Sequence, residues 1–114
     1  MTFEEYQQKA ITTDLAGGKP QPITSPAFYD KLLGLVGETG EVAEKFKKIY
    51  RDNNSQISPD QLQEIQKELG DVLWYISVMS TYLGLSFDEL ATKNIAKLID
   101  RKARGKNGGS GDNR

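Results

Sequence analysis

Apolar residues recur every three or four positions along most of the chain, which is the spacing of one face of an α-helix. The first such run predicts a helix over Thr2–Leu15 that ends before Gly17-Gly18. Residues 19–23 hold two prolines and predict an extended loop, since proline bars continuation of a helix. No segment alternates between apolar and polar residues as a half-buried strand does, so the pattern predicts helices throughout.

Serine caps mark the starts of three further helices, because a serine side chain accepts a hydrogen bond from the first free backbone N–H groups. The predicted helices run from Ser25-Pro26 to about Tyr50, from Ser58-Pro59 to Leu83, and from Ser86 to about Ala103. The fold class predicted is therefore all-α, a four-helix bundle in one domain of residues 1–104. A flexible Gly-rich tail follows over 105–114, and it is either a frayed end or a flap over a ligand.

Composition removes several classes of chemistry. The 114 residues include no Cys and no His, which excludes disulfides, thiolate zinc sites, Ser-His-Asp catalysis and histidine metal sites. Fifteen basic and 16 acidic residues give a net charge of −1, which argues against a nucleic acid polymer as partner. The first residues lack the basic and apolar segments of a signal peptide, and no apolar run is long enough to cross a bilayer. We expect a cytoplasmic protein without a membrane partner.

The second and third predicted helices each carry the pattern Glu-x-Gly-acid-Val. The acids are Glu38 and Glu41 in one copy, and Glu68 and Asp71 in the other. In both copies the acids lie about 60° and 120° to the same side of an apolar stripe. The stripes are Leu35, Val42, Phe46 and Ile49, and Ile65, Leu69, Val72, Ile76 and Leu83.

Antiparallel packing of the two stripes would bring both acid pairs to one pocket. Oxygen ligands without His or Cys favour Mg²⁺, with Mn²⁺ as a substitute. Glycine within a helix costs about 1 kcal/mol relative to alanine. Gly40 and Gly70 therefore predict that a helix or a phosphate approaches closely there. The alternative is that these acids form an ordinary solvated helix face, on which acids three residues apart are common. The spacing of the acids does not by itself identify a substrate.

Gly37-Glu38-Thr39-Gly40-Glu41, followed 27 residues later by Glu68-Leu69-Gly70-Asp71, resembles the signature of MazG-type nucleoside triphosphate pyrophosphohydrolases. Their pattern is EExxE, a spacer and ExxD, and this chain has Gly37 in place of the first Glu. The resemblance implies that all four acids ligate Mg²⁺, and that Glu38 or Glu41 positions or deprotonates a water. That water would attack the α-phosphorus of a nucleoside triphosphate and release a monophosphate and pyrophosphate.

The same resemblance implies contacts to the substrate. Asn94, Lys97 and Arg101 share one face of the fourth helix and resemble the family's Asn-x-x-Lys element, although a solvated basic face would look the same. Tyr75 and Trp74 are candidates to stack on the base, and Trp74 is equally a candidate for the core or a subunit interface. We predict a deoxynucleoside triphosphate, with a purine such as dGTP as a guess, and a homodimer or homotetramer. The alternative is a non-catalytic helical module that binds a partner protein.

Overall fold

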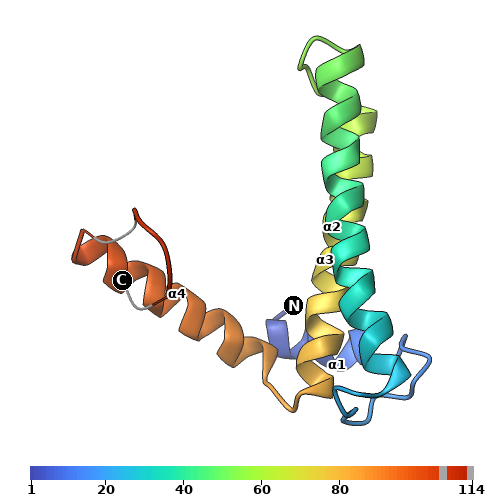
Figure 1. Cartoon of the computed structure of the whole chain (residues 1–114), viewed down its shortest axis with the longest axis vertical. Helices are drawn as coiled ribbons and strands as arrows, with labels where there is room; N and C mark the ends of the chain where they lie inside the picture. The colour runs from blue at the N-terminus through green and yellow to red at the C-terminus, as the bar shows by residue number, and fades with distance from the viewer. Residues whose placement is uncertain (106–107, 113–114) are drawn as a thin grey trace.

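The described residues form four α-helices, as the apolar spacing predicts. The computed structural model describes residues 1–105 and 108–112 and contains no strand within them (Figure 1). The helices are α1 (Phe3–Ile11), α2 (Pro26–Asp52), α3 (Pro59–Tyr82) and α4 (Phe87–Ala103). None of the described helices is long and apolar enough to span a membrane. The prediction of a flexible tail lies partly outside the described residues, at 106–107 and 113–114.

The antiparallel pair of α2 and α3 is the centre of the structure, and the two helices lie side by side in Figure 1. Ser25 and Ser58 cap them as predicted, each accepting a hydrogen bond from the backbone N–H three residues later. Gln61 closes the predicted capping box by accepting from the Ser58 N–H. The core of the molecule forms at the end of the pair where α2 begins and α3 ends, around Phe28, Val78 and Tyr82.

The first helix ends four residues earlier than predicted. It ends at Ile11, because the side chains of Thr12 and Thr13 hydrogen-bond to the carbonyls of Lys9 and Ala10. Short polar side chains of this kind compete with the helical hydrogen bonds of the backbone. The chain then turns inward and buries the carboxylate of Asp14.

A buried ion pair connects this turn to the helix pair. Asp14 Oδ1 lies 3.1 Å from Lys31 Nζ on α2, and the Tyr82 hydroxyl on α3 donates to the other carboxylate oxygen. Burial acts to raise the pKa of Asp14, but the hydrogen bonds from Tyr82 and Lys31 outweigh it and leave the pKa low. Burial and the bond to Asp14 raise the pKa of Tyr82 to about 12. The ion pair and the hydroxyl thus hold three parts of the chain together.

The fourth helix stands apart from α2. It contacts α1 and the end of α3, makes no contact with α2, and diverges from the helix pair (Figure 1). Leu69 and Leu83, both predicted for the apolar stripe, are consequently exposed, since α4 leaves them uncovered. The prediction that these two side chains are buried is wrong for the single chain.

Candidate functional site

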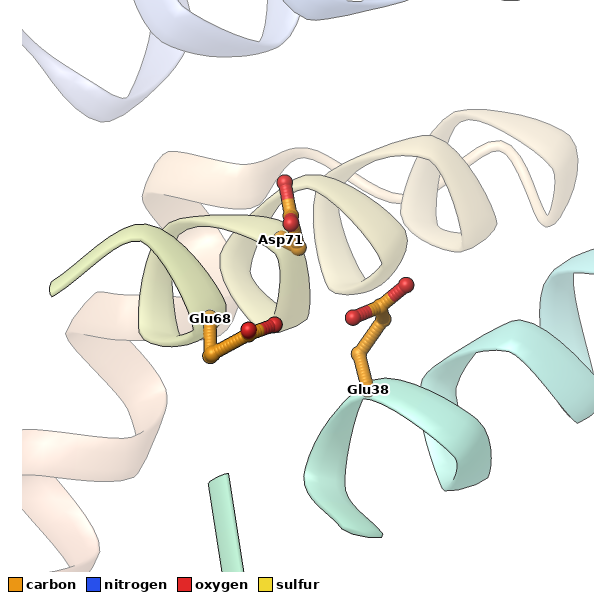
Figure 2. Close-up of side chains that lie close together, drawn as sticks. All are labelled: Glu38, Glu68 and Asp71. Atoms are coloured by element: carbon orange, nitrogen blue, oxygen red, sulfur yellow. The ribbon is translucent and has the colours of Figure 1, made fainter. Parts of the chain in front are cut away.

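Three of the four predicted acids meet where α2 and α3 run side by side. Glu38 extends from α2 toward Glu68 and Asp71 on α3 (Figure 2). Each of the three offers one carboxylate oxygen, and these oxygens all lie within 4.8 Å of one another. Glu38 and Glu68 are half-buried, while Asp71 is exposed. We call these three residues the carboxylate cluster.

The electrostatics of the carboxylate cluster favour a cation. Burial raises the pKa of Glu38, and the negative charges of Asp71, Glu68 and Glu41 raise it further. Like charges held this close are unfavourable unless a proton or a metal ion compensates them. The donor set is oxygen only and suits a hard divalent cation such as Mg²⁺.

Glu41 lies outside the carboxylate cluster. Its side chain is exposed. Its negative charge raises the pKa of Glu38, but its carboxylate oxygens do not belong to the group that lies within 4.8 Å. The two acids of α2 are three residues apart, which turns them about 60° from each other around the helix. Only Glu38 therefore faces α3, and Glu41 is left on the solvent side of the site.

One cation near the carboxylate cluster was not among the predicted site residues. Lys45 Nζ on α2 lies 3.7 Å from Glu68 Oε1 and 3.5 Å from Glu64 Oε2. Lys45 follows Glu38 by two helical turns and so lies on the same face of α2. That spacing is visible in the sequence and is the signal that could have identified this residue.

A tight contact between the two helices lies one turn from the carboxylate cluster. A Cβ atom built on Gly34 would lie 2.2 Å from Cε1 of Tyr75, so the tyrosine ring rests directly on the backbone of α2. Gly34 precedes Glu38 by four residues, and Tyr75 follows Asp71 by four. The Gly34–Tyr75 contact therefore sets the separation of the helices beside the cluster.

The close approach predicted at Gly40 and Gly70 is not made by the described part of this chain. A Cβ atom at either position would meet nothing within 4 Å. A helix of the same chain is thus the wrong explanation for these two glycines. Their other predicted partner, a phosphate, stays a prediction.

Both predicted base-stacking rings are engaged within the chain. The indole N–H of Trp74 donates to Thr13 Oγ1 over 2.8 Å, and the ring packs against the core. Tyr75 meets Trp74 edge-on, with the ring centroids 4.9 Å apart. Tyr75 is nevertheless only one turn from Asp71, so a base contact by either ring stays a prediction.

The three predicted phosphate contacts lie on α4. Asn94 and Lys97 line a groove of about 400 Å³ along the first turns of this helix. Lys97 and Arg101 both pair with Asp112 of the tail, which was not predicted. Because α4 does not touch α2, these three residues are not joined to the carboxylate cluster within one chain.

Comparison with known proteins supports the resemblance. The family model described as "MazG nucleotide pyrophosphohydrolase domain" matches residues 30–105. The chain belongs to the MazG family. It is also similar to "Gene 37 protein" of Mycobacterium phage L5, with 45% identity over 114 residues and complete coverage of both chains. No solved structure matched the chain.

The MazG match places the predicted site within the family domain. Residues 30–105 include nearly all of α2, all of α3 and α4, and every residue predicted for metal or substrate. The first helix and the turn that holds Asp14 precede the match. The predicted site therefore lies entirely within the MazG domain, while the preceding segment packs against the end of the helix pair where α2 begins and α3 ends.

Proposed function

We propose that this protein hydrolyses nucleoside triphosphates to a nucleoside monophosphate and pyrophosphate with the help of Mg²⁺. The observation that carries the proposal is the convergence of three carboxylates from two antiparallel helices within 4.8 Å. The family to which the chain belongs consists of nucleotide pyrophosphohydrolases, which supports this reaction type. We take a deoxynucleoside triphosphate as the substrate class, and dGTP as the first candidate.

Glu38, Glu68 and Asp71 would hold the metal ion. Bound there, Mg²⁺ would neutralise phosphate charge and lower the pKa of a water molecule. Glu41 is next to this group but outside it, and its carboxylate is exposed to solvent. Glu41 is therefore the acid best placed to position the attacking water and take its proton, while Glu38 serves the metal.

Pyrophosphate release measured with a panel of ribo- and deoxynucleoside triphosphates tests the reaction. We expect turnover in Mg²⁺, reduced but measurable turnover in Mn²⁺, and background rates in EDTA, because the carboxylates repel the triphosphate when no cation is bound. Chromatography of the products should show a monophosphate rather than a diphosphate. Turnover that persists in excess EDTA would contradict the metal-dependent mechanism.

The competing proposal is a non-catalytic helical module that binds another protein. It predicts no pyrophosphate from any substrate of the panel and no effect of Mg²⁺ on the protein. The cost of assembling three carboxylates side by side argues against it, since a protein-binding surface has no need of that arrangement.

We also propose that the chain pairs with copies of itself. Leu33 and Val36 on α2 are 70% and 66% exposed, and Ile99 on α4 is 63% exposed. Further exposed apolar residues on the same two helices are Tyr29, Leu32, Leu90, Ile95 and Leu98. A chain of this size buries only about 60–70% of the surface that its unfolded form exposes, and exposed apolar area on this scale is typical of a subunit interface.

Pairing would also complete the substrate site. At a rise of 1.5 Å per residue, Asp71 lies about 17 Å before the end of α3, and Lys97 lies about 15 Å after the start of α4. The two helices diverge (Figure 1), so the positions of Lys97 on α4 and of the carboxylate cluster on α2 and α3 are well separated within one chain. We propose that a second copy supplies its α4 to this cluster, in a homodimer or a homotetramer.

Light scattering coupled to size-exclusion chromatography tests the pairing. We expect a mass of two or four chains for the natural protein and one chain for Leu33→Arg, because a charge in an apolar interface is strongly unfavourable. Gln63→Arg, the same type of change at an exposed polar position of α3, serves as the control and should leave the mass unchanged. A monomeric natural protein with full activity would contradict the shared site.

A further inference from the structure

Residues 108–112 of the C-terminal tail lie beside α4 (Figure 1), and Asp112 among them pairs with two cations of this helix. Asp112 Oδ1 lies 3.1 Å from Lys97 Nζ and 3.0 Å from Arg101 Nη2. The same guanidinium nitrogen donates to the Gly111 carbonyl oxygen over 3.3 Å. Hydrogen bonds from Arg101 and Lys97 hold the pKa of Asp112 below its ordinary value, so the carboxylate is charged at neutral pH.

The two sides of this contact differ in how firmly they are held. Arg101 is 3% exposed, and its Nε is buried without a hydrogen-bond partner among the described residues. The Asp112 side chain, in contrast, is 80% exposed. A buried guanidinium with an unused donor favours binding of an anion, because an unpaired buried polar group is unfavourable. The exposed carboxylate is the partner that can leave.

A phosphate group has the chemistry to replace this carboxylate. Both present two oxygens to the planar fork of an arginine, and both attract a lysine ammonium. Lys97 also lines the groove of about 400 Å³ with Lys93 and Asn94, so a ligand in the groove would reach this cation first. The groove has the size of a typical small-molecule site.

We propose that Asp112 is a built-in competitor for the phosphate site of α4. Its carboxylate occupies Lys97 and Arg101 until a phosphate group displaces the tail. The inference rests on the proposed function in one respect, since it takes a nucleoside triphosphate as the natural displacing ligand. The competition lowers the apparent affinity by the fraction of time for which the tail is bound.

Binding of inorganic tripolyphosphate, followed by isothermal titration calorimetry at low salt, tests this competition. EDTA is included so that no metal ion can recruit the ligand to the carboxylate cluster. We expect Asp112→Asn to bind tripolyphosphate about two- to tenfold more tightly than the natural protein, as befits the loss of partly exposed ion pairs. Asp100→Asn is the matched control, because Asp100 on α4 pairs with Arg104, the residue directly after this helix, and not with Lys97 or Arg101. It should bind like the natural protein.

A double variant shows where the ligand binds. Adding Lys97→Gln to Asp112→Asn should remove the gain in affinity, because the two residues act through one contact. Equal affinity of Asp112→Asn and the natural protein, or an equal gain in Asp100→Asn, would overturn the proposal. A lower melting temperature without a change in affinity would also overturn it, because the tail would then be only a structural clamp.

The binding readout separates this inference from the proposed reaction. If Asp112→Asn gains affinity but no variant releases pyrophosphate, the competition stands and the proposed hydrolysis fails. If the natural protein hydrolyses nucleotides and the affinities are equal, the hydrolysis stands and the competition fails.

Discussion

Glu68→Gln should lose at least about 10³-fold in pyrophosphate release, because it removes a metal ligand that two other carboxylates cannot replace. Glu68 is the half-buried acid of α3 in the carboxylate cluster and contacts both Glu38 and Lys45. The amide keeps the shape of the side chain but carries no charge. The loss should appear in the rate and in the Mg²⁺ concentration needed for half-maximal activity.

Two matched variants test whether the loss in Glu68→Gln is due to the metal site. Glu64→Gln removes an acid one turn earlier on α3, which also pairs with Lys45 but lies outside the carboxylate cluster, and it should retain activity. Glu41→Gln should lower the rate by about 10²- to 10⁴-fold, the usual contribution of a general base, while the Mg²⁺ requirement stays the same. Equal shifts in the Mg²⁺ requirement for Glu41→Gln and Glu68→Gln would contradict the division of roles.

Gly34→Ala should be the most damaging single-methyl change in the helix pair. The new Cβ would lie 2.2 Å from the Tyr75 ring, so the ring or the backbone must move. Overpacking of this kind costs about 1–3 kcal/mol in the free energy of unfolding, which chemical denaturation can measure. A shift of 1 Å between the helices would also cost about 100-fold in activity, since Glu38 and Asp71 lie one turn away.

Gly37→Ala is the control for the Gly34 variant. It lies on the same helix, and its Cβ would meet nothing within 4 Å in the described structure. Alanine there should raise stability by about 0.4–1 kcal/mol, because it restricts the unfolded chain and favours the helix. If Gly34→Ala and Gly37→Ala had the same effect on stability, a clash with Tyr75 would not be the reason why glycine is needed at position 34.

The helices and the carboxylate cluster were accessible from the sequence because they depend on local periodicity. Serine caps fix where α2 and α3 begin, and the repeated Glu-x-Gly-acid pattern puts Glu38 and Glu68 at equal offsets from their stripes. The exclusion of His and Cys chemistry needed only composition. Each of these inferences uses information from within one helix or from the chain as a whole.

The features that were not predicted depend on the register and angle between helices. Whether Glu38 or Glu41 faces α3 depends on how α2 is rotated about its own axis relative to α3. The spacing of apolar residues in the sequence does not determine that rotation to within about 60°. The Gly34–Tyr75 contact joins residues far apart in the chain, as does the ion pair between Asp14 and Lys31. The exposure of Leu69 reflects the divergence of α4, which a stripe on α3 does not reveal.

The ion pair of Asp14 and Lys31 couples the unfolding of the N-terminal segment to the unfolding of the helix pair. Lys31 is buried beside the rings of Trp74 and Tyr82, and its ammonium pairs with the buried Asp14 and with the exposed Asp30. If the turn after α1 left the helix pair, Lys31 would keep only the exposed partner. Removing one partner of a buried ion pair is unfavourable, so partial opening of the N-terminal segment is rare. The segment before residue 30 and the end of the helix pair where α2 begins and α3 ends therefore melt as one cooperative unit, and slow amide exchange should extend across both.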